Sequence, residues 1–279
     1  SHNTAIGNNA GGAVTTGTSN TLIGSLAGDA LTDADFNIAI GVNSLTSDTL
    51  GSRSVAIGMG TLQTQNFTTA TNSHNTAVGY HAGQEVTTGV QNTLIGALAG
   101  DSITDANNNT ALGYAALSTN QRGAFNVAVG VGALQTANPS GAADTYNTAV
   151  GFDAGNAVTT GIRNTLIGGL AGVELTTGGS NVALGYEALK TEDAHGLNTA
   201  IGTQALFSLN AGADAYNTAV GFQAGAAVST GVQNTLLGGL AGDSLSVGNK
   251  NIAIGYRSLS GDTKGNKNVA VGNFALSTQ

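Results

Sequence analysis

The sequence predicts an all-β fold, a parallel β-solenoid (β-roll) of about sixteen coils, from two observations. The first is a short phrase, Asn-x-[Ala/Leu]-[Ile/Val/Leu]-Gly, which starts at sixteen places along the 279 residues, once with Ser in place of Asn. The second is its spacing, because twelve of the fifteen steps between starts are 17 residues long. A fixed short period indicates a repeat architecture in which each unit stacks on its neighbours. The starts are residues 3, 20, 37, 54, 75, 92, 109, 126, 147, 164, 181, 198, 217, 234, 251 and 268.

The three longer steps recur at every fourth unit, so the chain also consists of four super-repeats. We therefore predict a single repeat array over residues 1–279. Its super-repeats are 3–74, 75–146, 147–216 and 217–279.

Each unit is predicted to form one coil. Positions are numbered from the opening Asn as position 1, and position 5 is Gly in all sixteen units, which disfavours a helix. The pentamer is typical of a short strand that ends in a corner. We expect a second short strand at the V-T-T-G phrases of Val14–Gly17, Val86–Gly89 and Val158–Gly161. Coils stacked in this way lie ~4.8 Å apart.

The opening Asn and the fixed Gly have predicted structural roles. Asn opens fifteen units and Ser54 opens the other. Stacked Asn side chains can form a hydrogen-bonded ladder along the stack. The Gly, for example Gly7 or Gly79, fits a corner with positive φ or a place where another backbone leaves no room for a Cβ.

Both faces of the predicted strand are apolar. Positions 2 and 4 share one face and position 3 takes the other. Position 4 is Ile, Val or Leu, position 2 is Thr, Val or Ile, and position 3 is Ala in twelve units and Leu in four. A strand of this kind must be covered on both faces. We expect the coil interior to cover one face and a neighbouring chain to cover the other, in a closed homo-oligomer. The four leucines, which we place at the seam between chains, are Leu22, Leu94, Leu166 and Leu236.

The alternative is a wide monomeric solenoid whose outer face exposes alanine. Exposed alanine costs little, but four leucines exposed in register would form an adhesive apolar stripe. The pattern therefore favours the oligomer.

A resemblance to known fibres follows from these phrases. NTAIG, NIAIG, SVAIG and NVAVG resemble the coils of trimeric autotransporter adhesin heads, and NTAVGYHAG, NTALGYAAL and NTAVGFDAG resemble repeats of phage tail-fibre and related surface-fibre proteins. The resemblance covers residues 3–279 and implies a left-handed β-roll assembled as a homotrimer, outside the cell or on a virion surface. Two departures are coils longer than is typical of adhesin heads and the lack of an anchor, stalk or chaperone domain within these residues. Because the chain starts and stops inside the period, we expect a fragment of a longer fibre.

Composition argues against several other partners and structural features. The net charge is −8 with only 8 Lys and Arg, so nucleic acid is not an expected partner. No apolar run has the length of a membrane span. Cysteine is absent, which excludes disulfides and cysteine-type zinc sites. The 43 glycines suit a thin core of small aliphatic side chains.

Six aromatic residues follow the corner glycine in alternate coils and form a predicted ladder with a spacing of ~10 Å. One interpretation is a sugar-stacking stripe on the outside of the coils. The other is packing, in which each ring shields a glycine corner. Since Phe and Tyr interchange at this position, no hydroxyl chemistry is needed and packing is favoured. The residues are Tyr80, Tyr114, Phe152, Tyr186, Phe222 and Tyr256.

The lengthened coils predict three loops, at residues 66–74, 138–146 and 210–216. They occupy the same point of the super-repeat, so they should project from one edge. Loops on a rigid scaffold often carry contacts with partners. We expect them either to contact a receptor or glycan, or to act as spacers.

The sequence predicts no metal, no cofactor and no enzymatic activity. Asp29, Asp33 and Asp35 suggest a calcium site, but later super-repeats lose these acids, so solvated turn acids are favoured. No nucleophile elbow, zinc-protease motif, phosphate loop or pair of catalytic acids is found. The histidines, which lack metal-ligand spacing, are His2, His74, His81 and His195.

The predicted function is therefore a structural and adhesive fibre, a rigid trimeric rod that presents receptor- or glycan-binding surfaces. Alternatives are a ligand-binding solenoid such as an ice-binding protein, or an extracellular filament without specific receptor binding. Ice binding should need outward threonines in consecutive coils, whereas the Thr-Thr pairs at 15–16 and 87–88 are adjacent residues that face opposite ways. A polysaccharide-degrading spike, which needs clustered acids, ranks last.

Overall fold

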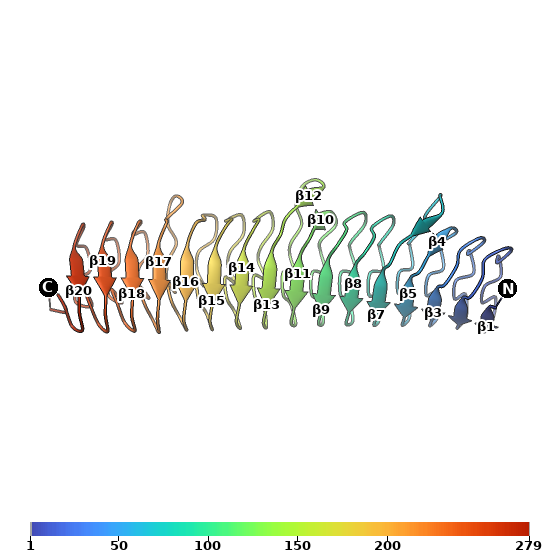
Figure 1. Ribbon diagram of the computed structural model, residues 1–279, viewed down its shortest axis with the longest axis horizontal. Helices are drawn as coiled ribbons and strands as arrows, with labels where there is room; N and C mark the ends of the chain where they lie inside the picture. Colours follow the sequence, from blue (N-terminus) through green and yellow to red (C-terminus); the bar gives the residue numbers. More distant parts are fainter. Residues whose placement is uncertain (1, 279) are drawn as a thin grey trace. The chain divides into compact units, whose positions relative to one another are not determined.

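The computed structural model describes residues 2–278, and within them it contains strands, turns and bends but no helix. The predicted fold class is confirmed, since sixteen short strands, one in each coil, stack as a parallel β-solenoid (Figure 1). Two compact units can be distinguished, Ser1–Thr145 and Tyr146–Gln279, and each is described by itself. No membrane-spanning helix occurs among the described residues.

Each unit contains eight of these strands, all three residues long and paired in parallel with their neighbours. In the first unit they are β1 (Thr4–Ile6), β2 (Thr21–Ile23), β3 (Ile38–Ile40), β5 (Val55–Ile57), β7 (Thr76–Val78), β8 (Thr93–Ile95), β9 (Thr110–Leu112) and β11 (Val127–Val129). In the second they are β13 (Thr148–Val150), β14 (Thr165–Ile167), β15 (Val182–Leu184), β16 (Thr199–Ile201), β17 (Thr218–Val220), β18 (Thr235–Leu237), β19 (Ile252–Ile254) and β20 (Val269–Val271). The register pairs equal positions of successive coils, as in Ala149 with Leu166. Equal side chains therefore form columns along each unit.

The predicted second strand at the V-T-T-G phrases is wrong. Residues 15–16 form a bend, and the amides of Thr15 and Gly17 both donate to the carbonyl of Thr32, at 3.0 and 3.1 Å. A strand ladder does not share one acceptor in this way. The extra strands instead form two small parallel pairs in the third and fourth coils of the first two super-repeats. These are β4 (Gly51–Ser52) with β6 (Thr71–Asn72), and β10 (Gly123–Ala124) with β12 (Ala143–Asp144).

The corner glycine meets both predicted requirements. Gly7 has a φ of 135°, and a Cβ added there would lie 2.4 Å from the carbonyl oxygen of Gly24 in the next coil. The same contact repeats at Gly24 with Gly41. Because the obstacle is backbone rather than a flexible side chain, the corner excludes even alanine.

The predicted asparagine ladder is confirmed, with a bond pattern that includes the backbone. Asn37 Oδ1 accepts from the amide of Ser54 at 2.8 Å, and Asn37 Nδ2 donates to the carbonyl of Gly51 at 2.8 Å. Each asparagine thus joins its own coil to the next one. Where Ser54 interrupts the column, Gln65 bridges it, donating to Ser54 Oγ and accepting from Asn75 Nδ2, each at 2.8 Å.

The core lies inside the coils, and the position-3 side chains point into it. The placement of Leu22, Leu94, Leu166 and Leu236 at a seam between chains is therefore wrong, because each is at most 1% exposed within a single chain. They fill space that glycine leaves open at position 9. Cβ atoms added at Gly225 and Gly242 would lie 2.7 and 2.9 Å from the methyl groups of Leu236.

In the third and fourth coils of each super-repeat, the leucine that fills the core is at position 9 and the small residue is at position 3. There position 3 is Ala and position 9 is Leu, as in Leu189 and Leu206, both fully buried. These leucines adopt a left-handed backbone, with φ of 52° and 49°. The super-repeat is therefore encoded in the core: position 3 supplies a leucine in the second coil and position 9 supplies one in the third and fourth, while the first coil has Ala and Gly there and leaves room for the leucine of the second.

Candidate functional site: the outer face of the sheet

The strands turn positions 2 and 4 outward, the reverse of the expected assignment of the two faces. In the first unit, Ile6 and Leu112 at position 4 are 59% and 45% exposed. In the second unit, Leu184 is 41% exposed and both Val269 and Val271 are 65% exposed. The uncovered side of the sheet thus carries Val, Ile or Leu at position 4 and mostly Thr at position 2, while position 3 is buried in every strand except β1.

This surface, which we call the outer sheet face, consists of positions 2 and 4 of every strand. Each of these residues is Thr, Val, Ile or Leu, and none carries a charge. Soluble monomers rarely expose a continuous apolar surface that runs along many strands. The outer sheet face is therefore the strongest candidate for an interaction surface within each unit.

The aromatic ladder follows the corner glycine and lies on the surface of both units. Its six side chains are between 46% and 58% exposed. The rings of Tyr186 and Tyr256 lie over glycines of the preceding coil, because a Cβ added at Gly169 or Gly239 would be 3.6 Å from the respective ring. This contact is the one that the packing interpretation expects, and half of each side chain remains open to solvent.

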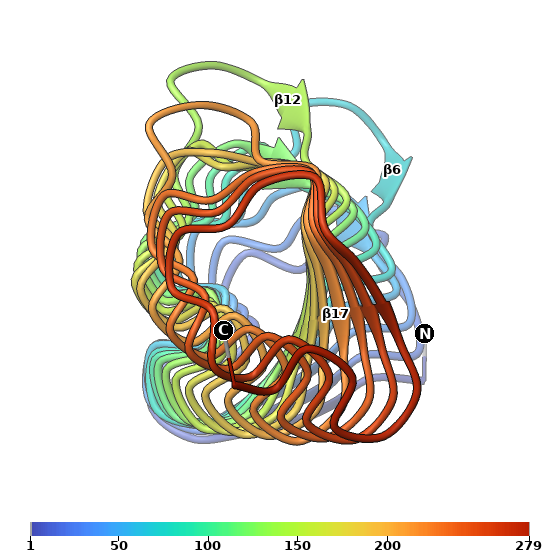
Figure 2. The same cartoon turned by 90° about the vertical axis from the view of Figure 1, so that its left-hand side faces the viewer.

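The loops at 66–74 and 138–146 project from the same side of the first unit, where β6 and β12 lie (Figure 2). A buried acid anchors the first of them. Asp48 Oδ1 accepts from the amides of Gly51 and Phe67 at 3.0 and 3.1 Å, and Oδ2 accepts from Gln65 Nε2 at 2.6 Å. Asp48 therefore ties its own coil to the start of the projecting loop in the next one.

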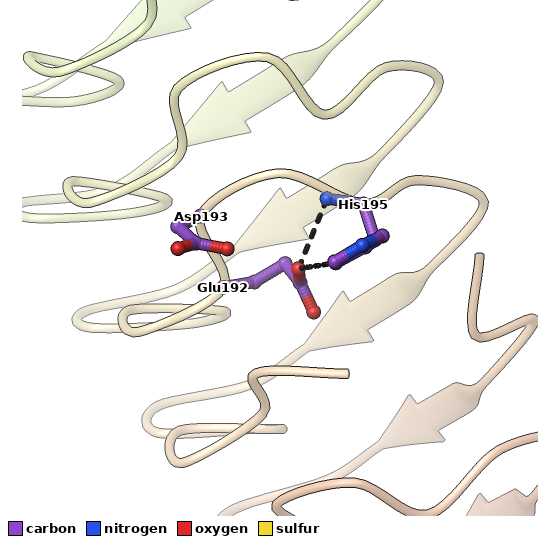
Figure 3. A group of neighbouring side chains, drawn as sticks. All are labelled: Glu192, Asp193 and His195. Atoms are coloured by element: carbon purple, nitrogen blue, oxygen red, sulfur yellow. Dashed lines mark hydrogen bonds and ion pairs between the residues drawn. The ribbon is translucent and has the colours of Figure 1, made fainter. Parts of the chain in front are cut away.

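The third super-repeat places Glu192, Asp193 and His195 together, with one potential metal-ligand atom of each within 4.8 Å of the others (Figure 3). Glu192 occupies the same position of its super-repeat as Asp48, and it likewise accepts backbone hydrogen bonds that anchor a loop. Its Oε1 accepts from the backbone amide of His195 at 3.1 Å and lies 3.2 Å from His195 Nδ1, and its Oε2 accepts from the amide of Ala211 at 3.2 Å. The carboxylate is thus already occupied in anchoring the loop at 210–216.

Sequence reasoning missed these anchors because they appear once per super-repeat with different residue types. Position 12 of the third coil is Asp48, Asn120, Glu192 and Asp262 in turn. In each case the side chain accepts from the backbone amide three residues on. Aligning the four super-repeats by coil would have revealed a polar side chain at a position that is otherwise mostly aliphatic.

The aspartates considered as calcium ligands accept hydrogen bonds from side chains and backbone amides. Asp29 accepts from the Thr46 hydroxyl, and Asp33 Oδ1 accepts from the Thr16 hydroxyl at 2.6 Å. Asp35 Oδ1 accepts from the Thr18 amide at 2.7 Å. These carboxylates connect neighbouring coils.

Burial raises the pKa of Asp48 above its ordinary value, against the lowering effect of its hydrogen bonds with Gln65, Phe67 and Gly51. A raised pKa means that folding favours the neutral acid, so the stabilising contribution is full at low pH and declines as pH rises through the folded-state pKa. We expect the free energy of unfolding to fall over that range, and to fall less in Asp48→Asn. Urea unfolding at a series of pH values measures this.

The matched control is Asp33→Asn, which removes an exposed carboxylate from the same unit and should retain the decline. An Asp48→Asn profile identical to that of the unmodified chain would contradict the assignment.

Comparison with family models, with curated proteins and with solved structures finds no match for this chain.

Proposed function

We propose that this chain is part of a structural and adhesive fibre, in which three copies cover one another's outer sheet faces on the outside of a cell or on a virion. The observation that carries the proposal is the outer sheet face, which is uncharged, is aliphatic at position 4 and Thr, Val or Ile at position 2, and repeats from strand to strand in each unit. Burying such a surface is favourable in proportion to the apolar area removed from water.

A second copy of the chain is the partner that fits this surface best. Its own outer sheet face has the same side chains at the same strand spacing, and equal surfaces pair readily in closed symmetric assemblies. The absence of charged residues there is what a permanently covered interface requires, since an unpaired buried charge is costly. The number three comes from the resemblance to trimeric fibre repeats, which NTAIG and NTAVGYHAG carry.

Contacts between chains are assigned to positions 2 and 4, in place of the buried position-3 leucines. The core of Ala, Val, Ile and Leu side chains then stabilises each coil, while positions 2 and 4 serve assembly.

Sedimentation equilibrium of the full chain tests the proposal. We expect a particle of three times the 27.3 kDa chain mass that persists at micromolar concentration. A monomer throughout that range would contradict the proposal, and a dimer would retain the covered face but exclude the trimer.

Ice binding remains a second candidate because the structure points threonines outward in consecutive coils. Thr76, Thr93 and Thr110 pair in register at position 2 of β7, β8 and β9. This column differs from the adjacent Thr-Thr pairs considered from sequence. A monomeric chain that shows thermal hysteresis would favour this function, and a trimer without hysteresis would favour the fibre.

A further inference from the structure

The second unit contains a groove formed by three successive coils. Its volume is about 540 Å³, and it follows the residues just before the opening asparagine of each coil. The lining residues are Val232, Gln233, Asn249, Lys250, Asn266 and Lys267. With coils ~4.8 Å apart, the lining spans ~10 Å from the first to the third.

Positive charge is concentrated at this end of an otherwise acidic chain. Four of the 8 Lys and Arg residues lie within 250–267, and Asp262 is the one acid in that range. Asp262 Oδ1 accepts from the amides of Lys264 and Gly265, at 3.0 and 2.7 Å, and so faces the backbone. The ion pairs of the described residues involve neither Lys250 nor Lys267. The groove therefore presents two ammonium groups without a neutralising carboxylate.

Amides complete the lining and are held in place by the coils. Asn249 Oδ1 accepts from the amide of Val232 and Asn266 Oδ1 accepts from the amide of Asn249, each at 2.8 Å. The backbone amide of Lys250 donates to the Val232 carbonyl, and that of Lys267 to the Asn249 carbonyl, both at 3.0 Å. These bonds engage the asparagine oxygens with the backbone of the preceding coil, and Asn266 Nδ2 donates to the Lys264 carbonyl at 3.2 Å. The side chains of Asn249 and Gln233 are then the amides that can donate to a ligand in the groove.

We propose that this groove binds an acidic saccharide, with Lys250 and Lys267 contacting its carboxylate or sulfate groups and the amides contacting its hydroxyls. A lining of amides and two cations matches a ligand that combines negative charge with many hydroxyl groups. The ~10 Å spanned by three coils suits a short oligosaccharide. Single-stranded nucleic acid fits less well, because the groove contains no aromatic side chain on which a base can stack.

This inference gives a ligand class to the adhesive role proposed above and rests on it. Binding and oligomeric mass are measured on the same full-length sample. If the chain is a trimer and binds no saccharide, only the proposal of saccharide binding fails. If the chain is a monomer, the proposed fibre function fails, whether or not the groove binds a saccharide.

Isothermal titration tests the groove with three tetrasaccharides. One alternates glucuronic acid and N-acetylglucosamine, one is its O-sulfated counterpart, and one is the neutral tetramer of N-acetylglucosamine. We expect at least one acidic probe to bind at least tenfold more tightly than the neutral one, and added salt to weaken it. Comparing the first two probes distinguishes carboxylate from sulfate recognition.

The variant Lys250→Gln/Lys267→Gln should weaken binding of the acidic probe at least tenfold. The matched control is Arg53→Gln/Arg163→Gln, which removes two charges from the same position of other coils and should change affinity less than twofold. Three results would overturn the proposal: no acidic probe binds at millimolar concentration, the lysine variant binds like the unmodified chain, or a decathymidylate binds more tightly than every saccharide.

Discussion

Leu184→Glu is expected to convert the proposed trimer into folded monomers. Leu184 is 41% exposed on the outer sheet face, so one chain by itself can solvate a glutamate there. In the assembly the same carboxylate would lie in an apolar interface and face its symmetry copies. Since burying an unpaired ion costs several kcal/mol and each 1.4 kcal/mol is tenfold in affinity, we expect association to weaken by about three orders of magnitude.

The control for this variant is Val247→Glu. Val247 is also 41% exposed, but it lies in the turn region of its coil, outside the strands that form the outer sheet face. Val247→Glu should leave the proposed trimer intact. Sedimentation equilibrium and a β-type circular dichroism spectrum measure assembly and folding for both variants. Equal masses for Leu184→Glu and the unmodified chain would show that the outer sheet face is not the interface.

Leu236→Ala is expected to destabilise the second unit by about 2–5 kcal/mol, and Gly242→Leu should recover most of that loss when the two are combined. The single Leu236→Ala change leaves a cavity in a core of small side chains. In the double variant the coil has Ala at position 3 and Leu at position 9, the arrangement of the next coil with Ala253 and Leu259. The three atoms nearest to a Cβ on Gly242 all belong to Leu236, at 2.9 to 3.6 Å, so removing that side chain makes room for it.

Gly242→Leu alone should also be destabilising, because the added side chain collides with Leu236 and the backbone φ is 58°. Urea unfolding of the four proteins completes a double-mutant cycle, and we expect a favourable coupling above about 1 kcal/mol. Additive effects would mean that positions 3 and 9 do not share one space.

Periodicity was enough to predict the stacked coils, because a strand, a glycine corner and an asparagine recur at fixed places in almost every unit. The role of Gly7 follows from its missing Cβ, which a tight corner requires. The role of Asn37 follows from its side-chain amide, which can donate and accept hydrogen bonds between stacked coils. The positions of the projecting loops also followed directly from the three longer steps. These features depend on residue types and spacings, which can be read directly from the sequence.

The direction in which each strand faces was decided by the tertiary structure. Alternation separates two faces, but when both are aliphatic it does not say which one lies inside. Volume decides instead: the narrow coil accepts Ala39 or, beside position-9 glycines, Leu22, and it leaves Ile38 and Ile40 outside. The same packing explains why the leucines at position 3 recur once per super-repeat. The anchors Asp48 and Glu192 and the lysine groove likewise depend on residues that only the stacked coils bring together.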